Sequence, residues 1–222
     1  SVFGSKNASD CVDCDAGKFA SATRASCINC PRGKYNEFKG RDSMHDCLPC
    51  GSSGAGNVGA TTSSSGSQAR TQCYCDKGYW GNISGGDAAC TACVAGKFLN
   101  TTDATSKTSC RDCGAGTYSA TAASTTCSLC AAGKYNQRPT GNDAESKCFG
   151  CGTNVAGNAA PQTVTDGAGT RHKTLCKCEK GYYGDVANWV FVGATFSFPC
   201  TACPEGKTTS TIGATLLEDC VA

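Results

Sequence analysis

The 222-residue chain carries a formal charge of only +2, and it has too few large apolar side chains for an ordinary core. Leu, Ile, Val and Phe together number 27, about 12% of residues, below the roughly 20% under which chains tend not to fold. Its 20 basic residues are scattered singly and no apolar run approaches the ~20 residues that span a bilayer, so neither nucleic-acid binding nor membrane insertion of this segment is expected.

Cysteine is the residue that compensates for the missing core. The chain contains 21 cysteines, a density typical of disulfide scaffolds in oxidising compartments. We therefore expect an extracellular or cell-surface protein that is held together by disulfides.

The cysteine spacing divides the chain into repeating blocks. Ten cysteines from Cys11 to Cys93 recur with nearly the same spacing from Cys110 to Cys203, which is typical of a linear array in which each unit contacts its neighbours. Both ends of the sequence fall within a repeat. The predicted boundaries are residues 1–10 for the tail of a preceding repeat, 11–109 and 110–219 for the two ten-cysteine blocks, and 220–222 for the start of a third.

The recurring motif is Cys-x-x-Cys-x-x-Gly-Lys-aromatic, as in the run from Cys27 to Tyr35. We expect its glycine to adopt a left-handed or strained backbone close to a disulfide, and its aromatic ring to lie against the sulfurs as a one-residue core. The motif is therefore structural. It predicts small disulfide-rich modules in an elongated rod, with sparse short β-hairpins and little or no helix.

These motifs carry a family resemblance that covers essentially the whole chain. The run Cys73-Tyr74-Cys75-Asp76-Lys77-Gly78-Tyr79-Trp80-Gly81 and its counterpart from Cys176 to Gly184 resemble the C-terminal half of an EGF-like module. The Cys-x-x-Gly-Lys-Tyr units resemble the cysteine-rich repeats of tumour-necrosis-factor receptors and ephrin receptors. Surface proteins of algae and other protists also use such units in tandem. The resemblance implies a scaffold and no particular activity.

The resemblance also favours a disulfide pairing in which each loop closes on the first cysteine of the next pair. Cys11 would then have no partner within the sequence. An interleaved scheme, first with third and second with fourth, would instead leave Cys220 unpaired, and the sequence does not decide between the two. The favoured pairs are Cys14 with Cys27, Cys30 with Cys47, Cys50 with Cys73, Cys75 with Cys90, Cys93 with Cys110, Cys113 with Cys127, Cys130 with Cys148, Cys151 with Cys176, Cys178 with Cys200, and Cys203 with Cys220.

Three N-glycosylation sequons begin at Asn7, Asn82 and Asn100, and they agree with a secreted chain. The Gly-, Ser- and Thr-rich loops after Cys50 and Cys151 are expected to be exposed, and they also offer sites for O-glycans.

One loop of the second block differs from its counterpart in the first. The segment from Cys178 to Cys200 is seven residues longer than that from Cys75 to Cys90 and holds the most apolar stretch of the chain. This stretch either folds back over its own disulfides or forms an interface with a partner or a second copy. Its candidate interface residues are Trp189, Val190, Phe191, Val192, Phe196 and Phe198.

Several kinds of chemistry lack support in the sequence. Two Cys-x-x-Cys pairs could together bind zinc. Against this, cysteines are spaced evenly along the whole chain, and only two histidines, His45 and His172, could act as further ligands. Asp10, Asp13 and Asp15 flank the first cysteines without the acidic signature of calcium-binding EGF modules. We find no phosphate-binding loop, metalloprotease helix or nucleophile elbow. We therefore expect no enzyme activity and no cofactor.

The favoured function is that of an extracellular structural protein, a repeat segment of a glycosylated surface filament or flagellar hair that self-associates. The alternative is the rod-like ectodomain of a cell-surface receptor or adhesion protein.

Overall fold

The computed structural model describes residues 13–51, 58–84, 89–151, 163–186 and 200–222. The chain divides into two compact units. One contains Ser1–Cys93 and Leu99–Cys110, and the other contains Val94–Phe98 and Arg111–Ala222.

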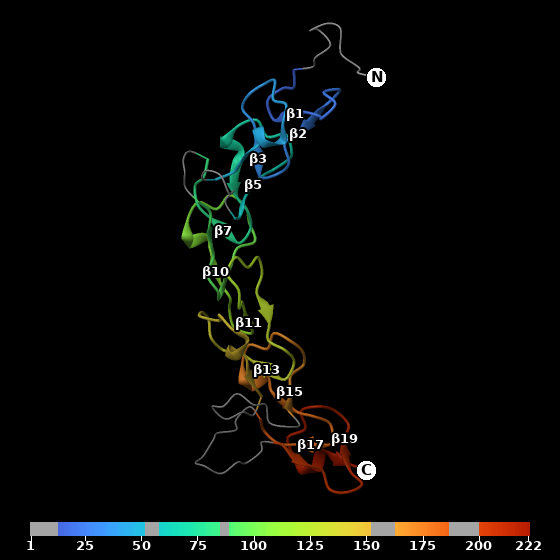
Figure 1. Ribbon diagram of the computed structural model, residues 1–222. Coiled ribbons are helices and arrows are strands. Elements are labelled where there is room, and N and C mark those ends of the chain that lie inside the picture. The colour runs from blue at the N-terminus through green and yellow to red at the C-terminus, as the bar shows by residue number, and fades with distance from the viewer. Residues whose placement is uncertain (1–12, 52–57, 85–88, 152–162, 187–199) are drawn as a thin grey trace. The chain divides into compact units, whose positions relative to one another are not determined.

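The described residues form ten two-stranded antiparallel hairpins (Figure 1). In most of them the first strand begins directly after the motif glycine, and the second lies at the next cysteine pair. Lys34 and Tyr35, for example, pair with Pro49 and Leu48, which stand between Cys47 and Cys50. The hairpins are β1 (Lys18–Ala20) with β2 (Cys27–Asn29), β3 (Lys34–Tyr35) with β4 (Leu48–Pro49), β5 (Ala60–Thr62) with β6 (Cys73–Cys75), β7 (Tyr79–Trp80) with β8 (Thr91–Ala92), β9 (Lys97–Phe98) with β10 (Arg111–Asp112), β11 (Thr117–Tyr118) with β12 (Ser128–Leu129), β13 (Lys134–Tyr135) with β14 (Phe149–Gly150), β15 (Thr163–Val164) with β16 (Lys177–Cys178), β17 (Tyr182–Tyr183) with β18 (Thr201–Ala202), and β19 (Thr208–Thr209) with β20 (Cys220–Val221).

In the described residues, helix is confined to single 3₁₀ turns, each directly before a disulfide cysteine. Side chains satisfy their free N–H groups: Ser43 accepts from the N–H of His45, and the Asp219 carboxylate accepts from the N–H groups of Thr215 and Leu216. The turns are η2 (Met44–Asp46), η3 (Arg70–Gln72), η4 (Lys107–Ser109), η5 (Glu145–Lys147), η6 (Lys173–Leu175) and η7 (Leu217–Asp219).

Ten disulfides close ten consecutive loops. They join the same pairs as the scheme in which each loop closes on the first cysteine of the next pair, and none follows the interleaved order. We call each closed loop a module and name it by its disulfide. The modules are Cys14–Cys27, Cys30–Cys47, Cys50–Cys73, Cys75–Cys90, Cys93–Cys110, Cys113–Cys127, Cys130–Cys148, Cys151–Cys176, Cys178–Cys200 and Cys203–Cys220.

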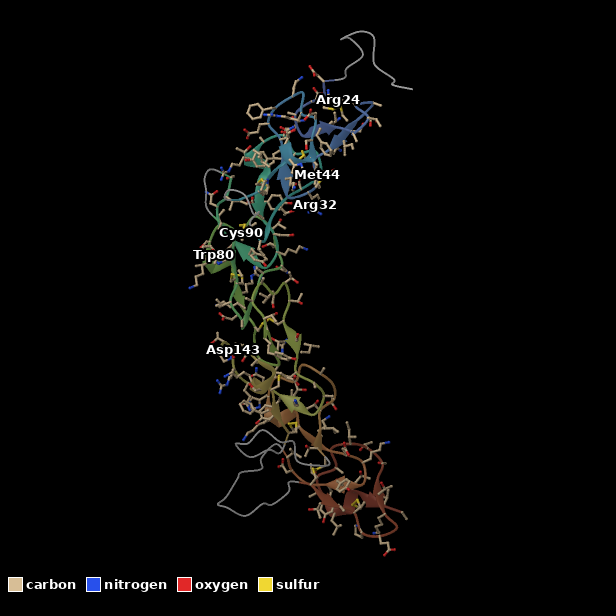
Figure 2. The ribbon with its side chains drawn as sticks, viewed as in Figure 1. Arg24, Arg32, Met44, Trp80, Cys90 and Asp143 are labelled. Carbon is tan, nitrogen blue, oxygen red and sulfur yellow. A yellow bond between two sulfur atoms is a disulfide. The ribbon has the colours of Figure 1, made fainter. Side chains whose placement is uncertain are left out.

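Cysteine supplies most of the buried apolar surface of the described residues. All but three of the twenty bonded cysteines are buried, and each of the three described core clusters contains at least one disulfide (Figure 2). The prediction of small disulfide-rich modules with short hairpins is therefore confirmed, whereas their arrangement in a rod stays a prediction. No helix of the described residues is long enough to cross a membrane.

Three of the predicted features lie outside the described residues. They are the unpaired Cys11, the sequon at Asn7, and the apolar insert that holds Trp189, Val190, Phe191, Val192, Phe196 and Phe198. The interface role of that insert stays a prediction.

Unequal burial predicts an order of reduction. Cys27, Cys127 and Cys203 are the partly exposed members of the bonded set, so a reductant should reach their disulfides before the fully buried Cys50–Cys73 bond. We expect mild phosphine reduction followed by alkylation and peptide mass spectrometry to label those three pairs first. Equal labelling of Cys50 and Cys73 at early times would contradict this order.

Candidate functional site at the module junctions

The functional features that the structure brings together are the junctions between successive modules. At the junctions that carry it, the motif glycine has a left-handed backbone, with φ between 78° and 85°. This confirms the predicted conformation, which glycine adopts without the steric cost that a Cβ imposes. The motif glycines are Gly17, Gly33, Gly59, Gly78, Gly96, Gly116, Gly133, Gly181 and Gly206.

In seven of these nine glycines both backbone groups are used in regular contacts. The carbonyl of Gly17 accepts from the N–H of Cys30 at 2.8 Å, and the same contact recurs at the second cysteine of six further pairs. The glycine N–H donates to the next module, at a residue that ends or directly follows its first strand. Asn36, Leu99, Ser119 and Asn136 accept through their backbone carbonyls, and Thr62, Thr165 and Thr209 accept through their side-chain hydroxyls.

All seven acceptor residues are buried, although six of them are polar. A buried polar group is costly unless it is hydrogen-bonded, so these side chains form specific contacts. The Thr62 hydroxyl, which is 0% exposed, accepts from the Gly33 N–H at 3.1 Å and donates to the Ser64 carbonyl at 2.8 Å. Each junction thereby acquires a defined register.

Three of the seven acceptor residues, Asn36, Ser119 and Asn136, each connect three successive modules. Asn36 accepts from Gly17 of the preceding module, and its own N–H donates to the Ser67 carbonyl of the following one. Its side-chain amide also donates to the Lys18 carbonyl at 2.9 Å. Ser119 and Asn136 make the corresponding backbone contacts in the second unit. Neighbouring modules are therefore coupled through single buried residues.

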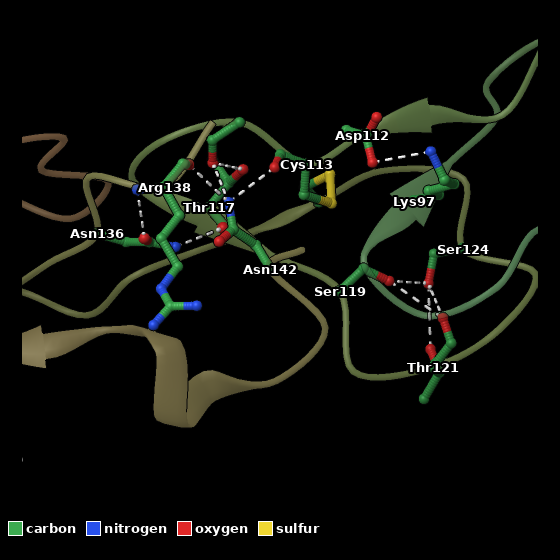
Figure 3. Close-up of a disulfide and its surroundings, with 12 residues drawn as sticks. Lys97, Asp112, Cys113, Thr117, Ser119, Thr121, Ser124, Asn136, Arg138 and Asn142 are labelled. Atoms are coloured by element: carbon green, nitrogen blue, oxygen red, sulfur yellow. Dashed lines mark hydrogen bonds and ion pairs between the residues drawn. A yellow bond between two sulfur atoms is a disulfide. The ribbon is translucent and has the colours of Figure 1, made fainter. Parts of the chain in front are cut away.

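A further contact secures the cysteine that opens a module. In five modules the N–H of a left-handed loop residue donates to the carbonyl of that cysteine, as Gly66 does to Cys30 and Asp103 to Cys75. At Cys113 the side chain of Asn142 takes this role (Figure 3). The Asn142 amide donates to the carbonyls of Cys113, Gly114 and Arg138 at 2.8–3.0 Å, and the residue is 0% exposed.

Close packing at two junctions leaves no room for a side chain. A Cβ added to Gly17 would overlap the carbonyl of Gly66, two modules further on, and a Cβ added to Gly116 would overlap that of Gly169. Gly206 has the same backbone conformation but open space beside it. Gly17 and Gly116 therefore require glycine for two separate reasons: their left-handed backbone, and the close approach of another backbone segment to the place where a Cβ would stand.

Some of the motif aromatics pack against disulfides, as predicted. Tyr35 belongs to a buried cluster with cysteines of the two following modules, and Tyr135 and Tyr182 pack in the corresponding cluster of the second unit. Burial raises the pKa of the Tyr135 hydroxyl. The rings therefore extend the hydrophobic contact across junctions.

The side chains that the sequence offered as metal ligands include two histidines at 3₁₀ turns and an aspartate in a surface ion pair. His172 is the N-cap of the 3₁₀ turn η6, and His45 is the middle residue of η2. The exposed Asp15 pairs with Lys39 at 2.9 Å, and the Lys39 ammonium lowers the pKa of the Asp15 carboxyl by hydrogen bonding and by its charge. Asp10 lies outside the described residues. Within the described part of the chain, no three His, Cys, Asp or Glu side chains are grouped as metal ligands.

The two described sequons are both accessible. Asn82 and Asn100 are exposed, and the Ser84 hydroxyl donates to the Asn82 amide oxygen at 3.0 Å. Ile83, which stands between Asn82 and Ser84, is 1% exposed in the core of its module. The Asn82 sequon is thereby anchored with its acceptor amide at the surface.

Sequence reasoning identified the glycines, aromatics and cysteines but missed the residues that accept from the glycines. A signal was available, since Thr or Asn recurs three positions after Gly33, Gly59, Gly133 and Gly206. Polar residues at the end of such short strands would ordinarily be assigned to the solvent side.

Comparison with known proteins agrees with this architecture. Residues 17–73, about a quarter of the chain, match the family described as tyrosine-protein kinase ephrin type A/B receptor-like. No curated protein matches the chain. The match and the ten disulfides show cysteine-rich repeats of the EGF-like and ephrin-receptor-like kind. They indicate an extracellular, non-enzymatic module of a receptor-like or structural ectodomain.

Replacing Gly116 separates the two requirements for glycine at a junction. Gly206→Ala should cost about 1–2 kcal/mol because of its left-handed backbone alone. Gly116→Ala should cost roughly 1–3 kcal/mol more because its Cβ meets the Gly169 backbone. Calorimetric melting of the oxidised proteins measures the difference. Equal destabilisation by the two substitutions would show that Gly116 does not pack as described.

Proposed function

We propose that the chain is a repeat segment of an extracellular structural protein, a glycosylated surface filament or flagellar hair that self-associates. The observation that carries the proposal is the regular junction, in which the motif glycine of one module bonds to a buried residue of the next. A binding module concentrates its distinctive residues at one site, whereas here the same contact recurs at seven junctions. Such regularity suits a spacer of repeating units.

The proposal predicts a filamentous location for the native protein. An antibody raised against the oxidised chain should decorate extracellular filaments of the source cells in immunogold electron microscopy. It should also label negatively stained filaments at a constant axial interval, because each copy contributes the same set of modules. A pre-immune serum is the control.

The second candidate is the rod-like ectodomain of a receptor or adhesion protein. The match of residues 17–73 to the ephrin-receptor-like family favours it. In that case the same antibody should label the plasma membrane without filaments, and the purified chain should sediment as a monomer. This outcome would replace the structural function by the receptor function.

N-glycans are part of the proposal, and we expect them on the exposed Asn82 and Asn100. When the chain is secreted from a glycosylating eukaryotic host, Asn82→Gln and Asn100→Gln should each remove the mass of one glycan. Ser84→Ala and Thr102→Ala break the same sequons without altering the asparagine, so they should give the same loss. An intact mass that no substitution changes would remove both sites.

A further inference from the structure

The order of the disulfides determines how the chain would carry tension. Each bond joins the second cysteine of one pair to the first cysteine of the next, over 13 to 25 residues, and no two loops overlap. A pulling force enters each module at one end of its disulfide and leaves at the other. The loop between them lies off the loaded path.

We infer that this segment is a nearly inextensible tether, in which disulfides and short cysteine-to-cysteine steps bear tension while the loops bear none. Cys14 and Cys220 are separated by 206 residues. The shortest covalent path between them crosses ten disulfides and only 25 residues, in seven steps of three residues and two steps of two.

The shorter path limits the length of the stretched chain. With Cα–Cα distances of 5.5–5.7 Å across each disulfide and at most about 3.5 Å per residue, the oxidised path reaches about 140 Å. The reduced chain between the same two residues would reach about 700 Å. The disulfides therefore remove roughly four-fifths of the available extension.

The loaded steps also have little slack of their own. All nine coincide with the second strand of a hairpin, from β2 to β18, so their backbone is already extended. Each is paired with a strand from the unloaded loop, as β8 (Thr91–Ala92) is with β7 (Tyr79–Trp80). Tension along the path would first separate modules at the hydrogen bonds of their junctions, and would leave the loops closed.

Burial protects this path from chemical cleavage. Seventeen of the twenty bonded cysteines are buried, and Cys30, Cys75, Cys113, Cys130, Cys151 and Cys178 are 0% exposed. An unloaded module therefore shields its disulfide from reductants. A tether would serve a filament or a receptor stalk equally well, so the inference goes beyond the proposed function.

Single-molecule force spectroscopy of the full chain, held by handles at its two ends, tests the inference. The comparison uses two double variants, Cys14→Ser with Cys27→Ser and Cys151→Ser with Cys176→Ser, which open loops of 13 and 25 residues. Relative to the oxidised wild type, the contour length at high force should increase by about 40 Å and about 80 Å. Because both partners are removed, neither cysteine of the opened pair is left to form a new disulfide.

The control and the opposing outcomes are well separated. Lys173→Ser changes an exposed residue of the Cys151–Cys176 loop and retains all disulfides, so it should add no length. A reducing buffer should give the full extension of about 700 Å between the outer cysteines. Equal gains from the two double variants, or extension of the oxidised wild type by several hundred ångströms, would overturn the inference. Contour length at high force does not depend on whether a variant folds, and electron microscopy decides the filament independently.

Discussion

The structure depends on the closure of one short loop after another by disulfides. A chain with so few large apolar side chains cannot bury enough surface to offset the conformational entropy that folding removes. Each crosslink over 13 to 25 residues removes unfolded-state entropy instead, at about 3 kcal/mol for such loops. Cysteine thus acts as both crosslink and core, and every module is stable without a large interior.

Loop closure alone would give modules that are independent of one another. The junctions add specific contacts between neighbouring modules. A left-handed glycine presents its N–H to the following module and its carbonyl to the next cysteine. The acceptor is buried, so its hydrogen bond is shielded from water and costly to break. Asn36, Ser119 and Asn136 extend the coupling over three modules.

Because the distinctive residues have structural roles, the described part of the molecule has the features of a scaffold and few groups suited to catalysis or ligand binding. The distinctive residues lie in turns, junctions and crosslinks. His172 caps the 3₁₀ turn η6, and His45 lies within η2. The ephrin-receptor-like match of residues 17–73 identifies modules of the same construction, in which function depends on what the surface of the array presents. Regular spacing and a short covalent path are properties that such an array supplies by itself.

The sequence alone predicted the left-handed glycines and the disulfide-rich hairpin fold, because glycine and a high cysteine content each have strong local meaning. The choice between sequential and interleaved disulfides, which sets the bounds of each module, came from the structure. The sequence did not reveal that Thr62 and Asn136 are buried, since strands of two or three residues are too short to show a periodicity that marks an inner face. Nor did it show that Gly116 meets the backbone of Gly169 whereas Gly206 has open space, because both stand at the same position of a Cys-x-x-Gly motif. Only the tertiary structure decides such contacts, since they join residues whose separation along the chain carries no signal of their approach.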